Sequence, residues 1–288
     1  MQNNIQRIFP PGDQWLYYNI FCGYNAADSI LIDHLNTLSK SLLSQNLIDQ
    51  WFFIRYNDPS YHIRYRVRLK DQNHVGLIIN TLNGLLQNPV SDEYIWKLQI
   101  DTYTREIERY GTSSMETAEK IFFYDSRNII NILSSLNEDQ ENIRSLWALK
   151  LIDFYLSVFK FSLAEKLAFT EKLRNYFYGE FRIDKNTKKQ FDKLYNENKQ
   201  VINVFLNKKI NTINKKHMAE SASEILRLKE KKLLTIDFHN LMSSFIHMSL
   251  NRLFIGDNRM HELVSYDFIW RYYKTQHYFN RTPAHHES

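Results

Sequence analysis

Arginine and histidine dominate the side chains of this sequence that could take part in chemistry. The stretch 61–69 reads YHIRYRVRL, in which one histidine and three arginines alternate with apolar residues. Successive side chains of a β-strand point to opposite faces, so these four would share one face. They are His62, Arg64, Arg66 and Arg68. Guanidinium groups bind carboxylates or phosphates through paired hydrogen bonds, so the row indicates either an anion site or a charged, solvent-facing sheet edge.

A second cluster of arginines lies in the segment 103–111, YTREIERYG. Arg105 and Arg109 are four positions apart, so they would share a face if the segment is helical. Neighbouring glutamates supply local partners, and exposed ion pairs of this kind contribute little to stability. The cluster is therefore either a second group that binds anions or an ordinary charged loop.

A third cluster lies in the segment 245–253, FIHMSLNRL, which has the spacing of an apolar helix. His247 and Asn251 are four positions apart and would share a helical face, so the amide could orient the imidazole. An imidazole is the natural general base near neutral pH. A lone histidine on an apolar helix is also common as a packed core residue, and the sequence leaves both interpretations open.

Other common site chemistries are not indicated. The sequence contains no glycine-rich phosphate loop, HExxH motif, cysteine pair or GxSxG motif, so we predict no cofactor and no metal. The single cysteine, Cys22, cannot form an internal disulfide, and no apolar run reaches the ~20 residues of a membrane span. These features predict a cytoplasmic protein. A Lys-rich segment, 182–232, either attracts nucleic acid or is a solvated helical face.

The N-terminal part of the chain has the patterns that would position the arginine row. Two apolar-aromatic runs, 51–56 and 61–69, flank the turn-forming tetrad NDPS and predict a β-hairpin. The other predicted elements are strands at 14–22 and 94–103 and helices at 25–45 and 74–88. The resulting order is strand, helix, strand, strand, helix, strand, which is typical of a ferredoxin-like sheet.

From residue 112 onward the spacing of apolar residues is helical. The predicted helices are 114–133, 137–161, 162–178, 187–206, 220–234, 237–254 and 260–279. N-caps are predicted at Asn137, Ser162 and Thr187, breakers at Gly179 and Gly256, and a loop at 207–217. The predicted fold is α+β: a ferredoxin-like βαββαβ portion, 1–111, followed by a mainly helical portion, 112–288, packed with it as one functional unit.

Taken together, the three clusters resemble the lantibiotic dehydratase C-terminal family, also called the thiopeptide-type bacteriocin biosynthesis domain. The matching motifs, in order, are WFFIRYNDPSYHIRYRVRL, REIERYG followed by FFYDS, and HMSLNRL, and the likeness runs from about residue 15 to residue 279. Two activities are known in that family. One eliminates glutamate from glutamylated Ser or Thr of a precursor peptide, and the other is a formal [4+2] cyclisation that builds a pyridine ring.

The resemblance implies a stand-alone elimination component of a split lantibiotic-type dehydratase. Its implied partners are a glutamylated, ribosomally made precursor peptide and a separate glutamyl-tRNA-dependent glutamylation protein, and a homodimer is possible. A leader peptide could add to an open strand edge of the sheet. The alternatives are a pyridine synthase of the thiopeptide type, a non-catalytic peptide-binding scaffold, and nucleic-acid binding through the Lys-rich segment.

The resemblance also assigns residues. Motif by motif, the catalytic residues fall on His247, Arg64 and Arg105, with the register between Arg64 and Arg66 left open. A wider set is expected to contact the substrate: Arg66, Arg68, His62, Arg55, Arg109, Asn251 and Arg252. Elimination needs a base for the α-proton and cations for the carboxylates of the departing glutamate, and these residue types supply both.

Overall fold

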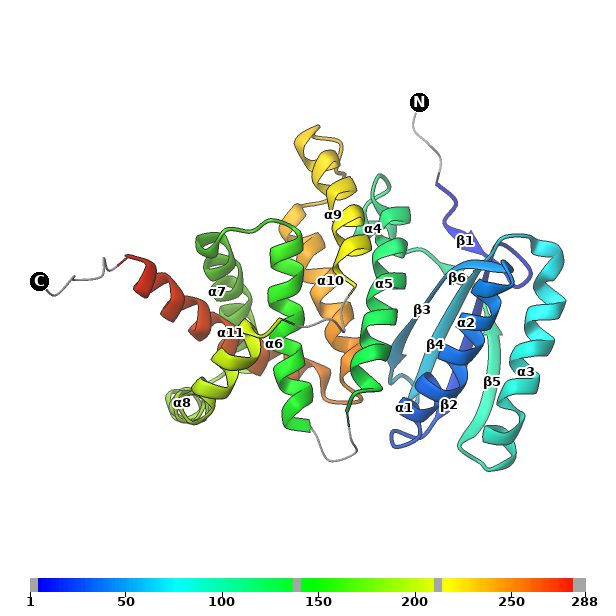
Figure 1. Cartoon of the computed structure of the whole chain (residues 1–288), viewed down its shortest axis with the longest axis horizontal. Coiled ribbons are helices and arrows are strands. Elements are labelled where there is room, and N and C mark those ends of the chain that lie inside the picture. The colour runs from blue at the N-terminus through cyan, green and yellow to red at the C-terminus, as the bar shows by residue number, and fades with distance from the viewer. Residues whose placement is uncertain (1–4, 137–140, 210–213, 282–288) are drawn as a thin grey trace, which may run out of the picture.

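The computed structural model describes residues 5–136, 141–209 and 214–281. The chain forms a sheet portion and a helical portion that lie side by side, with the strand β3 (Ile48–Tyr56) nearest the helices (Figure 1). The predicted α+β class is confirmed. No helix of the described residues is both long enough and apolar enough to cross a membrane.

Four antiparallel strands make the main sheet, in the order β3-β4-β2-β5. The other three strands are β2 (Trp15–Cys22), β4 (His62–Leu69) and β5 (Ile95–Asp101). The predicted hairpin is confirmed, since β3 pairs with β4 and Tyr56 lies opposite His62. A small second sheet joins β1 (Ile8–Phe9) to β6 (Tyr103–Thr104).

The arginine row lies inside the sheet, because β4 is flanked by β3 on one side and β2 on the other. The alternative of a solvent-facing sheet edge is therefore wrong. In the register of the sheet, Arg66 is opposite Tyr17 of β2 and Phe52 of β3, while Arg64 is opposite Asn19 and Ile54. Aromatic and polar neighbours thus surround the guanidinium groups from both sides.

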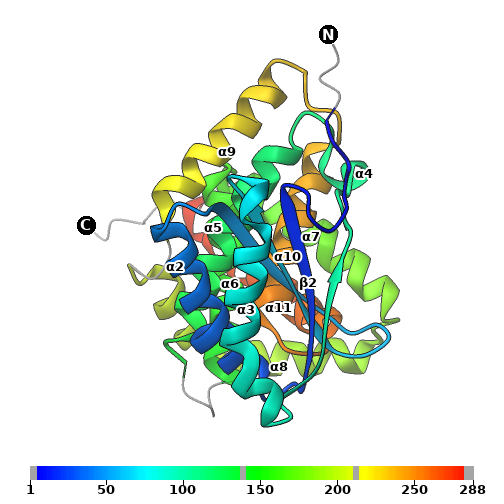
Figure 2. The same ribbon diagram turned by 90° about the vertical axis from the view of Figure 1, so that its right-hand side faces the viewer.

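The apolar face of the hairpin is covered by the helices of the sheet portion (Figure 2). These are α1 (Ala27–Ser29), a π-helical segment (Ile30–Leu35), α2 (Asn36–Ser44) and α3 (Val75–Ser91). Ser39 of α2 and Tyr65 of β4 share a buried hydrogen bond of 2.7 Å. Tyr65 alternates with the arginines along β4, so the arginine row belongs to the opposite face, which these helices leave uncovered.

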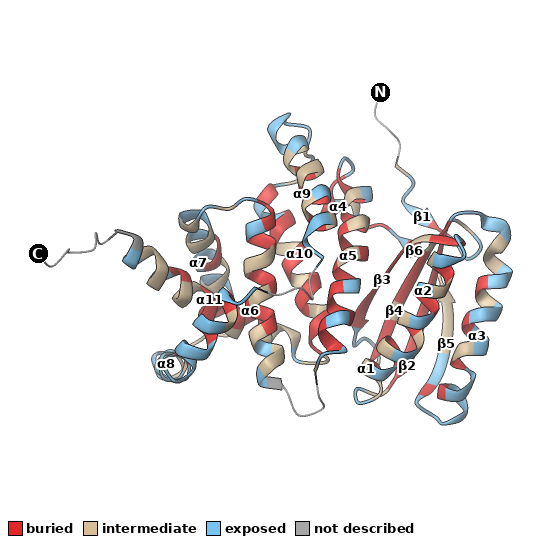
Figure 3. Ribbon diagram, in the orientation of Figure 1, coloured by how far each residue is buried: buried red, intermediate tan, exposed pale blue. Residues whose placement is uncertain are grey.

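The helical portion contains α4 (Ile107–Tyr110), α5 (Met115–Leu133), α6 (Glu141–Val158), α7 (Leu163–Glu180), α8 (Lys185–Asn207), α9 (Lys215–Glu230), α10 (Phe238–Leu253) and α11 (Asn258–Arg281). Buried residues concentrate in β2 to β4 and where α5 and α10 face them, whereas α8 is largely exposed (Figure 3).

Several predicted helix ends are confirmed and others are wrong. Ser162 caps α7, where Glu165 completes a capping box. Thr187 does not cap α8; Asp184 does, and its carboxylate accepts the Thr187 N–H. Gly179 lies inside α7 rather than ending it. The predicted loop 207–217 is wrong at its two ends, because α8 runs to Asn207 and α9 begins at Lys215. Positions 210–213 of that loop and the predicted cap Asn137 lie outside the described residues.

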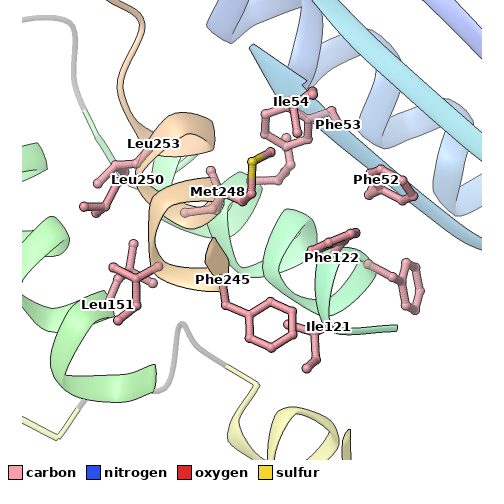
Figure 4. Close-up of a cluster of buried hydrophobic side chains, with 14 of the residues drawn as sticks. Phe52, Phe53, Ile54, Ile121, Phe122, Leu151, Phe245, Met248, Leu250 and Leu253 are labelled. Carbon is pink, nitrogen blue, oxygen red and sulfur yellow. The ribbon is translucent and has the colours of Figure 1, made fainter. Parts of the chain in front are cut away.

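Side chains of the helical portion seal the outer edge of β3. Ser126 accepts the Phe53 N–H, and Arg252 donates through Nε to the Phe53 carbonyl at 2.7 Å. The Asn251 amide accepts the Arg55 N–H and donates to the Arg55 carbonyl, both at 3.0 Å, as a neighbouring strand would. Apolar packing between β3, α5 and α10 surrounds these bonds (Figure 4). This edge of the sheet is therefore closed to a further strand.

Asp28 links the two portions electrostatically. Its carboxylate binds Arg55 of β3 at 2.5 Å and Arg144 of α6 at 2.6 Å. Burial opposes ionisation, but the two guanidinium groups outweigh it, so the pKa of Asp28 lies below its usual value. A carboxyl with a lowered folded-state pKa adds stability above its unfolded pKa, and loses that contribution as the pH falls through the folded value.

Asp28→Asn is expected to lower the free energy of unfolding by about 2 kcal/mol at pH 7, because it removes the anion shared by two cations. The loss should shrink as the pH falls below the unfolded pKa of an aspartate, about 3.9, and on towards the lowered pKa of the folded state, because the stability that the wild-type carboxylate contributes is lost over that range. Urea unfolding of both proteins at pH 7 and pH 3 measures the difference. A loss of the same size at both pH values would contradict the electrostatic role of Asp28.

Candidate functional site

The arginines of the row differ in their partners. Arg68 forms two hydrogen bonds to the Asp49 carboxylate, at 2.7 and 2.6 Å, so its charge is neutralised. Arg64 has no ion pair with a described carboxylate. Its guanidinium instead stacks 3.4 Å from the centre of the Tyr56 ring, and its Nε donates to His62. Arg64 therefore keeps an uncompensated positive charge that is only partly exposed.

His62 supports Arg64 as a neutral imidazole. Its Nδ1 lies 2.8 Å from the Ser60 carbonyl, which can only accept, so Nδ1 carries the proton. The Nε2 is then free to accept from Arg64 at 3.1 Å. Burial lowers the pKa of His62, and the charges of Arg64 and Arg66 lower it further. The predicted contact of His62 with substrate is thus replaced, in this structure, by a contact with Arg64.

Arg66 is a buried cation with unused hydrogen-bonding capacity. Its exposed fraction is 7%, it forms no ion pair within the described part of the chain, and its Nε is buried without a hydrogen-bond partner. The guanidinium lies 4.2 Å from the Tyr17 ring centre, 4.9 Å from Tyr103 and 5.3 Å from Phe52. Burial lowers the pKa of Arg66. Aromatic faces attract the charge but accept no strong hydrogen bond, so the group is suited to receive an anion.

Helix α10 approaches Arg66 across a small cavity of about 20 Å³. Met248 and Arg252 of α10 line this cavity together with Arg66 and Glu106. Figure 4 shows the Met248 side chain extending from α10 toward β3. His247, the predicted catalytic histidine, directly precedes Met248 on α10. The helix that carries His247 therefore lies beside the arginine row.

His247 is oriented by a carboxylate. Its Nδ1 lies 2.9 Å from Oε1 of Glu262 on α11, which is 2% exposed, while the imidazole itself is 26% exposed. Because a carboxylate accepts, Nδ1 donates, and Nε2 has no hydrogen-bond partner among the described residues. The predicted orienting role of Asn251 is wrong, since that amide binds the Arg55 backbone.

The second predicted cluster does not act as a pair. Helix α4 begins at Ile107, so Arg105 precedes it and does not share a helical face with Arg109. Arg105 is bound by Glu119 at 2.8 and 2.7 Å. Burial raises the pKa of Glu119 and the Arg105 charge opposes this. Arg109 donates to Ser244 of α10 at 3.2 Å. In this structure Arg105 is therefore committed to an internal carboxylate.

Two further predicted contacts also have internal partners. Arg55, 1% exposed, binds Asp28 and donates to the Arg252 carbonyl at 2.8 Å. Arg252, also 1% exposed, binds Asp125 at 2.9 Å. Breaking such a pair leaves a buried, uncompensated charge. Both arginines hold the sheet and helical portions together.

Arg252→Met is expected to lower the free energy of unfolding by about 3–5 kcal/mol, because Asp125 is left buried without its cation. The double variant Arg252→Met with Asp125→Asn removes both charges, and we expect it to regain at least about 1 kcal/mol. Urea unfolding followed by circular dichroism measures both variants. A double variant less stable than the single one would contradict the buried-pair role.

Three carboxylates not predicted from the sequence decide which cations are neutralised: Glu262, Asp49 and Glu119. An acidic residue on a helix or strand carries no local signal of its partner. Glu262 is 15 positions from His247, on the next helix, and Asp49 is 19 positions from Arg68 across the hairpin. Within the described residues, no group of three His, Cys, Asp or Glu side chains could hold a metal ion.

Comparisons of the sequence relate this chain to proteins of lantibiotic biosynthesis. A family model described as "Lantibiotic biosynthesis dehydratase C-term" matches residues 15–273. The chain is 25% identical over 274 residues to the nisin biosynthesis protein NisB of Lactococcus lactis subsp. lactis, covering 93% of the chain and 26% of NisB. It is 26% identical over 268 residues to the subtilin biosynthesis protein SpaB of Bacillus subtilis, covering 88% and 25%. The chain thus spans about a quarter of the length of these curated relatives.

Solved structures share the fold. The tRNA-dependent lantibiotic dehydratase MibB from Microbispora sp. 107891 superposes with a TM-score of 0.70 at 17% identity, over 95% of this chain and 29% of MibB. The pyridine synthase TbtD from thiomuracin biosynthesis gives a TM-score of 0.64 at 11% identity, over 91% of this chain and 100% of TbtD. At these identities the likeness concerns the fold alone.

Proposed function

Because the chain belongs to the family of lantibiotic biosynthesis dehydratase C-terminal domains, we propose that it eliminates glutamate from glutamylated serine or threonine residues of a precursor peptide. The observation that carries this proposal is the contrast within the arginine row. Arg68 is neutralised by Asp49, whereas Arg64 and Arg66 have no carboxylate partner among the described residues. Cations kept without a partner, beside the helix of His247, fit a substrate that brings its own carboxylates.

In the proposed reaction a base removes the α-proton of the esterified serine or threonine. The Cβ–O bond then breaks, and the electron pair leaves with glutamate as a carboxylate while the Cα–Cβ double bond forms. Arg64 and Arg66 bind the free carboxylate of the glutamyl group and stabilise the second carboxylate that forms as the ester leaves. The product is dehydroalanine from serine or dehydrobutyrine from threonine.

His247 is the proposed base, acting through Nε2. The Glu262 carboxylate accepts from Nδ1 and so fixes both the ring orientation and the nitrogen that stays unprotonated. The same carboxylate would stabilise the imidazolium that forms when the α-proton is taken. Arg105, in its bond to Glu119, is a positioning residue in this proposal, because it ties β6 to α5 beside the Arg66 cavity.

The wider assignments are part of the same proposal. The strand order β3-β4-β2-β5, with its two helices, supports a ferredoxin-like sheet as the platform of the site. Glutamylation is a separate, preceding step that uses a glutamyl-tRNA-dependent activity. The substrate peptide is a ribosomal product, so we place the reaction in the cytoplasm.

The test is incubation of the purified protein with a peptide that carries O-glutamyl serine, followed by mass spectrometry. Loss of glutamate with a peptide otherwise intact supports elimination. Release of the leader segment with ring closure from a substrate that already holds two dehydroalanines would instead favour a pyridine synthase. Binding of the peptide without any mass change would favour a non-catalytic scaffold.

A further inference from the structure

A cavity of about 630 Å³ lies between the tip of the β3–β4 hairpin and the turn that joins α10 to α11. We call it the hairpin-turn pocket. Its lining includes Tyr56, Asn57, Tyr61, Gly256, Asn258 and Arg259. We propose that this pocket binds the uncharged peptide segment adjoining the glutamylated residue, an inference that rests on the proposed elimination.

The pocket adjoins both halves of the proposed site through side chains that line it and contact members of the site. On one side, the Tyr56 ring lines the pocket and carries the Arg64 guanidinium 3.4 Å from its centre. On the other side, Arg259 lines the pocket and binds Glu262 at 3.0 Å, the carboxylate that orients His247. A peptide whose glutamyl residue lies between Arg64 and His247 would therefore continue into this space.

The chemistry of the lining favours a neutral segment over a second anion. Arg55 is compensated by Asp28, and Arg259 by both Glu180 and Glu262. The remaining lining groups are aromatic rings, aliphatic and thioether side chains, side-chain amides and the carboxylate of the exposed Asp257, whose charge would repel a second anion. The Asn258 Oδ1 is buried and has no hydrogen-bond partner among the described residues, so a turn of this amide toward the pocket would let it accept a peptide N–H. The volume lies within the ~300–1,000 Å³ of typical binding clefts.

Gly256 offers a way to fill the pocket without touching the charged groups. Its φ is not positive, and an added Cβ would meet only the Tyr24 ring, at an ordinary contact distance of 3.7 Å. Gly256→Trp therefore adds bulk at the lining. Gly84→Trp is the matched control, because Gly84 lies on the exposed side of α3 and a Cβ there meets nothing within 4 Å.

Two substrates distinguish peptide binding in the hairpin-turn pocket from the elimination step. One is a peptide with several residues on each side of O-glutamyl serine, and the other is O-glutamyl serine capped by acetyl and amide groups, which is too short to enter the pocket. Gly256→Trp is expected to raise KM for the peptide by about tenfold or more, while kcat/KM for the capped residue stays within about twofold. Gly84→Trp should change neither. Asn258→Ala, which removes the buried acceptor with little change in shape, should raise KM for the peptide about threefold to tenfold.

An unchanged KM for the peptide in both Gly256→Trp and Asn258→Ala would overturn the inference. Equal losses on the peptide and the capped residue would also overturn it, because the pocket would then belong to the reacting centre. If the wild type releases glutamate from neither substrate, the proposed elimination fails by itself. Fluorescence anisotropy with the labelled peptide then tests whether the pocket binds the peptide. Weaker binding by Gly256→Trp than by the wild type supports the inference, and equal binding overturns it.

Discussion

Arg66→Met is expected to lower kcat/KM for glutamate release by about 100-fold or more. Among the described residues, Arg64 and Arg66 of the row have no carboxylate partner, and Arg66 is the more deeply buried of the two. A group that binds developing charge in such a site contributes about 3–4 kcal/mol. Methionine keeps much of the side-chain volume within the rings of Tyr17, Phe52 and Tyr103. Steady-state kinetics with the glutamylated peptide measure the loss.

The same substitution should leave stability unchanged or raise it by about 1 kcal/mol. Burial of a cation without a carboxylate costs free energy, and an apolar side chain of similar size avoids that cost. Loss of activity together with equal or greater stability is the signature of a residue kept for function. A large fall in the midpoint of urea unfolding for Arg66→Met would instead indicate a structural role.

Arg68→Met is the matched control on the same strand and face. Asp49 already neutralises Arg68, so we expect elimination to fall by less than about threefold, with a small loss of stability from the broken, partly exposed pair. Arg64→Met should behave like Arg66→Met in activity, because Arg64 also lacks a carboxylate partner among the described residues. A similar loss of activity in Arg68→Met would remove the distinction on which the proposed function depends.

The second large effect is expected at His247. His247→Gln keeps a side chain able to contact Glu262 but removes the base, and a positioned acid or base typically contributes about 10²–10⁴-fold. We therefore expect kcat to fall by at least about 100-fold with little change in binding of the peptide. Single-turnover kinetics and anisotropy with the labelled peptide separate the two quantities. Full turnover by His247→Gln would exclude His247 as the base.

Glu262 should act through His247 rather than on the substrate. Glu262→Gln removes the charge that stabilises the imidazolium formed when the α-proton is taken, so kcat should fall about tenfold while KM for the peptide stays within about twofold. Glu180→Gln is the control, because it contacts Arg259 but not His247. An unchanged kcat in Glu262→Gln would show that the carboxylate only packs the helices.

The features that follow from short-range patterns could be predicted from the sequence. Alternation along 61–69 and the turn tetrad specify the hairpin, and the Ser162–Glu165 capping box is a four-residue signal. Which arginines are neutralised by a carboxylate could not be predicted, because the partners are distant along the chain. Asn251 pairs with the Arg55 backbone 196 positions away, which converts a predicted site residue into one that closes the sheet edge.

The same reason explains why the sequence left open whether the arginine row lies at a sheet edge. A charged strand pattern looks alike at an edge and in the middle of a sheet, and only the pairing of β2 with β4 decides between them. The resemblance of motifs identified the family correctly. It did not distinguish Arg105, which is engaged by Glu119, from Arg64 and Arg66, which have no carboxylate partner in the part of the chain that the structure describes.

The most direct test is a crystal structure of the protein with a peptide in which glutamate is joined by an amide to diaminopropionate, a linkage that does not eliminate. We expect the free carboxylate of the glutamate within about 3 Å of the guanidinium nitrogens of Arg64 or Arg66. We also expect His247 Nε2 within about 3.5 Å of the α-carbon of the modified residue. Glutamate bound elsewhere, with both arginines unchanged and the imidazole remote from the α-carbon, would contradict the account.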